Sequence, residues 1–196
     1  MQVNNKAELR KHFKKIRSEM DKKMRSDFDK NIFENVCSLN EYINCRQVLV
    51  YVSSEIEVGT RQLMEKAFSE KEVLCPRCVD GTNIMYFYKV SSFEELEKGS
   101  FGILEPRIEC EKAEVFDNAV CIVPALSFDR YGFRLGFGKG FYDRFLENFS
   151  GAKIGLCYEN CLSQTLPSDI YDINVDKIAT EERTIVARKD DKINGR

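Results

Sequence analysis

The chain has 196 residues, of which 43% are hydrophobic and 32% are charged, and its formal net charge at pH 7 is −2. This length and composition predict one globular domain with a buried core, and the balanced charge provides no overall field that favours nucleic acid. Because no apolar run approaches the ~20 residues of a membrane span and residues 1–15 lack a signal-peptide core, we expect a cytoplasmic protein without membrane contact.

Hydrophobic periodicity and turn residues divide the chain into alternating helices and strands. In chain order, the patterns predict helices over 5–24 and 27–40, a buried strand at 48–52, a helix capped by Thr60, strands at 73–75 and 84–88, a loop at 105–106, a strand at 119–123, a helix carrying Phe141, Phe145 and Phe149, and strands at 153–157, 176–180 and 184–187. This alternation predicts an α/β fold, a single domain with a largely parallel sheet flanked by helices on both faces. We expect the domain to cover residues 1–187 and a polar tail to cover 188–196.

The first predicted helix carries a stripe of basic residues. Lys6, Arg10 and Arg17 fall on one side of the helix, together with Phe13. Because Phe13 is a candidate for the core, these cations could be aimed inward at an anionic group. A solvated basic face is the alternative, and the spacing alone does not exclude it.

Two further patterns have structural alternatives. Phe141, Phe145 and Phe149 recur at steps of four, which we interpret as core packing, with a platform for stacking bases as the alternative. Eight cysteines are present, and without a signal peptide we expect reduced thiols. The pairs Cys75–Cys78 and Cys157–Cys161 have spacings seen in zinc sites, but neither has a second pair or a histidine cluster beside it. The only histidine, His12, is expected to be solvated, which leaves little support for histidine-based triads.

The segment 134–145, RLGFGKGFYDRF, is the most informative part of the chain. It contains three glycines at alternate positions, and a backbone without Cβ atoms can turn its N–H groups toward one anion. Arg134 and Lys139 add positive charge, and Asp143 can hold the Mg²⁺ that accompanies nucleotide phosphates. The glycine spacing fits neither the dinucleotide fingerprint nor the P-loop, and a tight structural turn is the alternative. Since a turn needs no embedded cations, the segment predicts a phosphate site, most simply one for ATP.

Two acidic residues are candidates by position. Glu57 follows a predicted buried strand, where α/β sheets place ligand sites, although exposed loop glutamates are common. Asp172 lies in an acidic stretch at 167–176, and residue chemistry alone does not select it from its neighbours.

The sequence resembles the 5-formyltetrahydrofolate cyclo-ligase family, also called methenyltetrahydrofolate synthetases. The matching motifs run nearly from end to end: KAELR at 6–10, EVGT at 57–60, FGILEP at 101–106, VPALSFD at 123–129, GFRLGFGKGFYD at 132–143, Asp172, and VDKIATE at 175–181. The central glycine motif is highly specific for the family, and the outer motifs add order and spacing. Phe137 and Phe141 replace the tyrosines that are usual in the family, so two hydroxyl groups are missing here.

This resemblance implies an enzyme of the ligase class that fills residues 1–187 with one cyclo-ligase domain. It implies conversion of 5-formyltetrahydrofolate to 5,10-methenyltetrahydrofolate, driven by ATP and Mg²⁺, with release of ADP and phosphate through an O-phosphorylated formyl intermediate. The expected partners are the two small-molecule substrates, without nucleic acid or membrane, and we expect a monomer. The alternatives are a non-catalytic folate- or nucleotide-binding regulatory protein on the same fold, an RNA-binding module and a general ATP-dependent kinase.

The resemblance also implies roles for individual residues, with Lys139 and Arg134 catalytic and Asp143 and Asp172 holding Mg²⁺. The residues implied to contact ATP are Lys6, Arg10, Arg134, Leu135, Gly136, Phe137, Gly138, Lys139, Gly140, Phe141 and Tyr142. Those implied to contact the folate are Val52, Glu57, Phe101, Phe137, Gly138, Lys139, Gly140 and Phe141. Among these, Glu57 would bind the pterin, because its amino and ring N–H groups pair naturally with a carboxylate.

Overall fold

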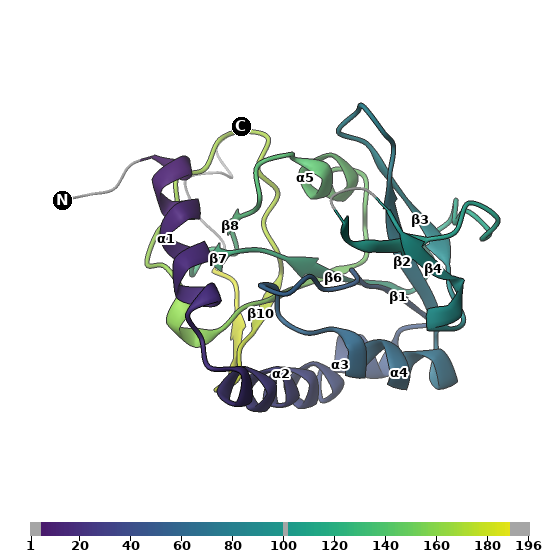
Figure 1. Cartoon of the computed structure of the whole chain (residues 1–196), viewed down its shortest axis with the longest axis horizontal. Helices are drawn as coiled ribbons and strands as arrows, with labels where there is room; N and C mark the ends of the chain where they lie inside the picture. The colour runs from purple at the N-terminus through teal and green to yellow at the C-terminus, as the bar shows by residue number, and fades with distance from the viewer. Residues whose placement is uncertain (1–4, 100–101, 189–196) are drawn as a thin grey trace.

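The structure is a computed structural model that describes residues 5–99 and 102–188. The chain forms, in order, α1 (Lys6–Ser18), α2 (Lys22–Cys37), α3 (Asn40–Asn44), β1 (Gln47–Leu49), α4 (Arg61–Glu70), β2 (Glu72–Cys78), β3 (Met85–Lys89), the short 3-10 helix η1 (Phe93–Glu95), β4 (Leu96–Lys98), β5 (Leu104–Pro106), β6 (Ala119–Pro124), β7 (Ser127–Phe128), β8 (Arg134–Leu135), α5 (Phe141–Leu146), β9 (Ala152–Leu156), the 3-10 helix η3 (Glu159–Cys161), β10 (Lys177–Ala179) and β11 (Thr184–Val186) (Figure 1).

A seven-stranded sheet forms the centre of the molecule, in the order β11-β10-β9-β6-β1-β2-β3. The five inner strands run parallel, whereas the edge strands β11 and β3 run antiparallel to their neighbours. In the middle of the sheet, Val48 of β1 pairs with Val73 of β2 and Val120 of β6. These valines are buried, as expected for strands that are covered on both faces.

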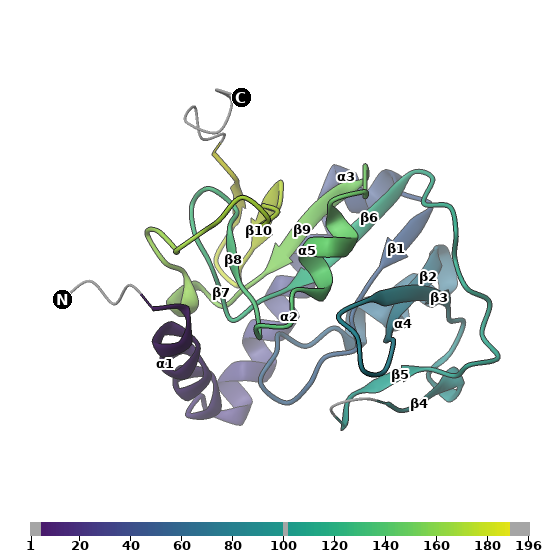
Figure 2. The same ribbon diagram turned by 90° about the horizontal axis from the view of Figure 1, so that it is seen from above.

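Helices cover both faces of this sheet. α2, α3 and α4 lie along one face and α5 lies on the other, while α1 stands at one end beside the β7–β8 pair (Figures 1 and 2). The predicted α/β fold, a single domain with a largely parallel sheet, is therefore confirmed. The tail at 189–196 lies outside the described residues, so the domain limit at residue 187 stays a prediction. None of the described helices is long and apolar enough to cross a membrane.

The predicted single helix over 5–24 is wrong at residues 19–21, which separate two helices. α1 ends at Ser18, and α2 begins at Lys22 after the N-cap residue Asp21. The Asp21 carboxylate accepts hydrogen bonds from the backbone N–H groups of Lys23 and Met24, at 2.9 and 3.0 Å. An aspartate in this position stabilises the start of a new helix more than the continuation of an existing one. The spacing of apolar residues therefore continues across a break between two helices.

Two smaller predictions also need correction. Residues 105–106, predicted as a loop, belong to β5, which pairs with β4 and brings Pro106 opposite Leu96. Thr60 does precede α4, but its side chain does not cap the helix, because its hydroxyl donates to the Tyr51 carbonyl oxygen at 2.7 Å. Thr60 therefore fixes the loop after β1 to that strand's end.

The cysteines are all free thiols in the structure, and all eight belong to the described residues. Cys75 and Cys78 both lie on β2. Because residues three apart in a strand point to opposite faces, these two thiols are not placed to chelate one ion. Within residues 5–99 and 102–188, no group of three or more His, Cys, Asp or Glu side chains is arranged to hold a metal.

Asp129 organises the turn that leads from β7 into β8. Its carboxylate accepts hydrogen bonds from the backbone N–H groups of Tyr131, Phe133 and Leu166, at 2.9, 3.1 and 2.9 Å. Burial raises the pKa of Asp129, and these three N–H donors oppose that shift by favouring the carboxylate form. The turn therefore presents β8, and the glycine segment after it, in one orientation.

Replacing Asp129 with alanine would leave three backbone N–H groups without their acceptor, so we expect the free energy of unfolding to fall by about 3 kcal/mol. Urea denaturation measures this loss. Asp21→Ala is the matched control, because Asp21 also accepts backbone N–H groups but at an exposed helix start, where the expected loss is about 1 kcal/mol. Equal losses for the two variants would contradict the role given to Asp129.

Candidate active site

The sheet topology selects one edge for a ligand site. From β1 the chain crosses through α4 to β2 on one side, and from β6 it crosses through α5 to β9 on the other side. The connections that follow β1 and β6 therefore diverge, and α/β sheets bind ligands at the carboxyl ends of two such strands. The connection after β1 contains Glu57, and the connection after β6 contains the glycine loop, which we define as residues 136–140.

The glycine loop uses backbone conformations that suit glycine. Gly138 has a φ of 105° and Gly140 a φ of 69°, both in the region that side chains disfavour. Gly140 is also the N-cap residue of α5, so the loop ends at the start of a helix. At Gly138 an added Cβ would lie 3.3 Å from the Arg10 guanidinium carbon, so the loop is also packed closely against α1.

The basic stripe of α1 points inward, so of the two alternatives that the spacing left open, the structure supports the inward orientation and not the solvated basic face. The Lys6 Nζ donates to Asp172 Oδ2 at 2.7 Å, and the Arg10 Nε donates to the Gly136 carbonyl oxygen at 2.9 Å. Arg17, on the same stripe, is only 1% exposed. The stripe therefore brings Lys6 and Arg10 to the glycine loop and to Asp172, as expected for two residues implied to contact ATP.

Arg134 and Asp143 form an ion pair behind the loop. The Arg134 guanidinium donates to Asp143 and also to the Ile173 carbonyl oxygen, at 2.6 Å in the second case. Burial lowers the pKa of Arg134, while the nearby carboxylates of Asp143 and Asp172 oppose that shift. Arg134 thus holds Asp143 and the Ile173 backbone in place.

Asp143 and Asp172 fit the requirements of a Mg²⁺ site. The Oδ1 atom of Asp143 accepts from Arg134 and from the Ile173 N–H, and the Oδ2 atom of Asp172 accepts from Lys6 and the Asp169 N–H. Both carboxylates thereby have fixed orientations on neighbouring segments, and both act on the same guanidinium. Mg²⁺ is usually bound by one or two carboxylates together with phosphates and water, so two carboxylates without a third ligand suit it.

The loop that carries Glu57 is held by side chains at successive positions. Arg25 donates to the Glu57 carbonyl oxygen at 2.7 Å, and the Tyr51 hydroxyl donates to the Val58 carbonyl oxygen at 2.9 Å. The Glu57 side chain, 7% exposed, accepts from the Ser54 N–H through Oε2 at 2.8 Å. Glu57 is therefore fixed by its surroundings and differs from an exposed loop glutamate.

Arg17 connects the Glu57 loop to the segment that leads to the glycine loop. Its guanidinium donates to the Ile56 carbonyl oxygen at 3.1 Å and to the Leu126 carbonyl oxygen at 3.0 Å. Leu126 lies between β6 and β7 and also pairs with β8, since its N–H donates to the Leu135 carbonyl oxygen at 2.8 Å. The buried Arg17 thus connects α1 both to the Glu57 loop and to the segment that leads to the glycine loop.

The Tyr142 hydroxyl is buried and has no hydrogen-bond partner among the described residues. Burial raises the pKa of Tyr142, and electrostatic interactions with Cys121, Glu57 and Tyr51 raise it further, so the phenol stays protonated. A buried donor without a partner is costly in a folded protein, and a bound molecule that supplies the partner would offset the cost.

The remaining predicted site residues differ in exposure. Phe137 and Lys139 are exposed at the tip of the glycine loop, and the Lys14 ammonium lies 5.6 Å from the centre of the Phe137 ring. Leu135 is 1% exposed, so any contact it makes with ATP is through its backbone. Val52 is half-buried in the connection after β1. Phe101 lies outside the described residues, so its predicted contact with the folate is untested.

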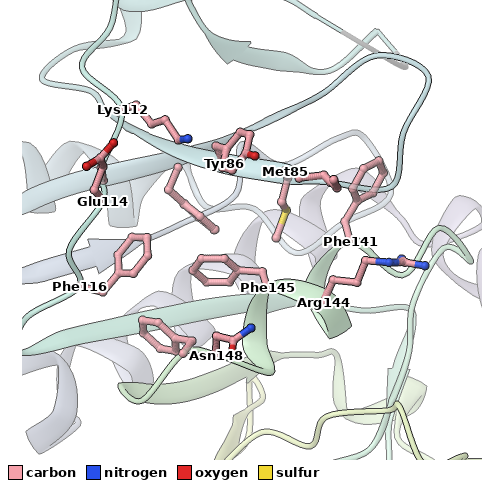
Figure 3. Close-up of a pocket in the computed structure, with 13 residues that line it drawn as sticks. Met85, Tyr86, Lys112, Glu114, Phe116, Phe141, Arg144, Phe145 and Asn148 are labelled. Atoms are coloured by element: carbon pink, nitrogen blue, oxygen red, sulfur yellow. The ribbon is translucent and has the colours of Figure 1, made fainter.

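A cavity of about 440 Å³ opens between α5, β3 and the segment 112–116 (Figure 3). Most of its lining is apolar or aromatic, and the residues are Ile84, Met85, Tyr86, Phe87, Lys112, Ala113, Glu114, Phe116, Phe141, Arg144, Phe145, Asn148 and Phe149. The ring centres of Phe145 and Phe149 lie 5.5 Å apart, and both side chains belong to or pack against the core, which confirms the predicted packing role of that stripe. The predicted helix is too long, however, because α5 ends at Leu146 and Phe149 follows it. The other walls come from distant parts of the chain, so no pattern in the sequence indicated the cavity.

A sequence model of the 5-formyltetrahydrofolate cyclo-ligase family matches residues 2–181. A probable 5-formyltetrahydrofolate cyclo-ligase of Schizosaccharomyces pombe is 32% identical over 173 residues, which cover 79% of this chain and 84% of the relative. The solved structure of a 5,10-methenyltetrahydrofolate synthetase from Aquifex aeolicus has a TM-score of 0.80 at 35% identity, and the match covers 94% of each chain. A second solved synthetase, from Mycoplasma pneumoniae, has a TM-score of 0.72 at 22% identity over 90% of this chain and 99% of that one, and supports the fold alone.

Arg17→Met keeps most of the side-chain volume but removes both hydrogen bonds to the loop carbonyl oxygens. Because two backbone acceptors would lose their donor, we expect the free energy of unfolding to fall by about 3 kcal/mol, as measured by urea denaturation. Tyr51→Phe, which removes one bond to the same loop, should cost about 1 kcal/mol. A methionine variant as stable as the parent protein would show that the loops are not held by Arg17.

Proposed function

Because this chain belongs to the 5-formyltetrahydrofolate cyclo-ligase family, we propose that it uses ATP to close 5-formyltetrahydrofolate to 5,10-methenyltetrahydrofolate, releasing ADP and phosphate. The resemblance predicted from the sequence motifs is confirmed by the family match and by the relatives. The finer parts of the proposal are the dependence on ATP and Mg²⁺, the phosphorylated intermediate and the roles of single residues. A cytoplasmic monomer stays a prediction from the sequence.

One observation carries the ATP part of the proposal. Lys6 and Arg10 of α1 meet the glycine loop and Asp172 at the carboxyl edge of the sheet. These groups come from three separate parts of the chain and combine cations, backbone N–H groups and carboxylates. This is the combination that a triphosphate with its metal requires.

The chemistry follows from the poor leaving ability of the formyl oxygen. In the first step this oxygen attacks the γ-phosphorus of ATP, the bond to the bridging oxygen breaks, and ADP leaves with that electron pair. The product is an O-phosphorylated iminium at N5 of the folate. N10 then attacks the formyl carbon, the carbon–oxygen bond breaks with release of phosphate, and N10 loses its proton.

The chain's own residues act mainly through position and charge, because phosphoryl transfer requires little covalent help. The N–H groups of the glycine loop and the ammonium of Lys139 would lie against the transferred phosphoryl group, and Lys6 and Arg10 would hold the remaining phosphates. Arg134 would keep Asp143 oriented. Asp143 and Asp172 would hold Mg²⁺, which when bound neutralises phosphate charge.

The folate side of the site uses Glu57 and Tyr142. Glu57 is buried, so its carboxylate offers a strong acceptor for the pterin amino and ring N–H groups. The Tyr142 hydroxyl, which lacks a hydrogen-bond partner among the described residues, offers a donor from the first turn of α5. A pterin has adjacent donors and acceptors along its edge, so it can satisfy both groups. Holding N10 close to the formyl carbon would also lower the entropic cost of ring closure.

The direct test is turnover by the purified protein. Mixing it with 5-formyltetrahydrofolate, ATP and Mg²⁺ should raise the absorbance of the methenyl product, with one ADP formed per product. A regulatory protein on the same fold would bind the ligands without turnover. A general kinase would form ADP with other acceptors and no methenyl product. Either of these results would contradict the proposed function.

Lys139→Ala should lower kcat by about 100-fold, since it removes a cation from the transferred phosphoryl group, while the dissociation constant for the folate changes little. Steady-state kinetics and calorimetry measure the two effects. Lys15→Ala is a suitable control, because Lys15 is also an exposed lysine, and among the described residues its one ion pair is with the C-cap residue of its helix, Glu19, at 3.8 Å. Near-normal turnover of the Lys139 variant would remove that residue from the mechanism.

Glu57→Gln keeps the size of the side chain and an acceptor for the Ser54 N–H but removes the charge. The dissociation constant for 5-formyltetrahydrofolate should rise roughly tenfold, because a charge-assisted hydrogen bond becomes a neutral one. ATP affinity should stay unchanged. Calorimetry with each ligand gives both values, and unchanged folate affinity would show that Glu57 lies outside the pterin site.

A further inference from the structure

We propose that the cavity between α5, β3 and residues 112–116 binds the aminobenzoyl-glutamate tail of the folate, with Lys112 contacting a glutamate carboxylate. This inference rests on the proposed function, because it assigns a place to the part of the substrate that does not react. The predicted site residues account for the pterin and the phosphates but, apart from Phe141, not for this tail.

The cavity is continuous with the candidate site. Phe141 is the first residue of α5 and directly follows the glycine loop, and Arg144 lies one turn further along the helix. The Arg144 guanidinium donates to the carbonyl oxygens of Lys139 and Gly140, at 3.2 and 3.1 Å. In Figure 3, Phe141 and Arg144 lie at one end of the cavity, and Phe116 and Glu114 lie at the opposite end. A tail that leaves the reacting centre beside Phe141 would therefore enter this cavity.

The walls suit a flat aromatic ring. Phe116 and Phe145 meet edge to face, with ring centres 5.3 Å apart, and Phe145 lies in the middle of the cavity (Figure 3). Ile84 and Tyr86, on the opposite wall, are 46% and 40% exposed, although apolar side chains gain from being covered. The volume of the cavity, about 440 Å³, falls in the usual range for small-molecule sites.

The charges at the far end suit a carboxylate. The Lys112 ammonium lies over the Tyr86 ring, 3.5 Å from its centre, and so is held at the wall of the cavity. Each glutamate of a folate tail adds negative charge, and an aminobenzoyl group bound near Phe145 would bring the first glutamate toward Lys112. Glu114 lines the same end and repels carboxylates. The balance between Lys112 and Glu114 would therefore set how strongly the protein prefers tails with more glutamates.

The test compares three substrates that share one reacting centre: 5-formyltetrahydropteroate, which has no glutamate, and the monoglutamate and triglutamate forms of 5-formyltetrahydrofolate. For the parent protein, KM should fall as glutamates are added. Lys112→Ala should raise KM about threefold for both glutamate forms, as expected for a partly exposed ion pair, and should leave KM for the pteroate unchanged. Lys112→Glu should reverse the order of preference, and Glu114→Gln should strengthen it.

Arg61→Ala is the matched control. Arg61 is also an exposed cation over an aromatic ring, 4.2 Å from the centre of Phe93, but it belongs to α4 on the other face of the sheet. It should change none of the three KM values. Equal KM ratios in the parent protein and the Lys112 variants would overturn the inference. A change in KM for ATP alone would also overturn it, because the cavity would then hold the adenine.

A binding measurement separates this inference from the proposed function. Aminobenzoyl-triglutamate lacks the reacting centre, so its binding needs no turnover. NMR shifts in the ring signals of Phe116 and Phe145 should report its entry, and Lys112→Glu should abolish them. If the protein forms no methenyl product but shows these shifts, the proposed function fails and the cavity assignment stands. If turnover occurs and the shifts are absent, the assignment fails and the function stands.

Discussion

The buried guanidinium of Arg17 is the interaction on which the candidate site depends. In the described part of the chain it has no carboxylate partner, and it is held by two carbonyl oxygens, one in the Glu57 loop and one just before β7. Since Lys6 and Arg10 lie on the same stripe of α1, the contacts that fix Arg17 also determine where these two cations meet the glycine loop. One helix thereby sets the distance between the Glu57 loop and the glycine loop.

Much of this arrangement was predictable from the sequence, because its signals are local. The glycine loop, the basic stripe and Glu57 each stand out within a few residues, and helix periodicity and buried strands indicated the fold. The predicted single helix over 5–24 failed because two local preferences compete at Asp21. The apolar period favours a continued helix, whereas Asp21 favours the start of a new one. The anchors Arg25 and Asp129 and the cavity were not predictable, because their partners are brought close only by folding.

The two cations of the motif, Arg134 and Lys139, differ in burial and in their surroundings. Arg134 is 8% exposed and bonded to Asp143, whereas Lys139 is exposed at the tip of the loop. A buried arginine in a fixed ion pair orients its neighbours, and an exposed lysine can follow a phosphoryl group as it moves. Phe141, where the family usually has tyrosine, opens into an aromatic cavity, so the missing hydroxyl suits the apolar surroundings of this chain.

In the proposed site, the glycine loop binds a triphosphate beside a reduced folate. The decisive experiment is a crystal structure with a non-hydrolysable ATP analogue and 5-formyltetrahydrofolate. We expect phosphate oxygens within hydrogen-bond distance of the loop N–H groups and of Lys6 and Arg10, with the pterin against Glu57. A triphosphate bound elsewhere, with the glycine loop making no contact to it, would overturn this proposal.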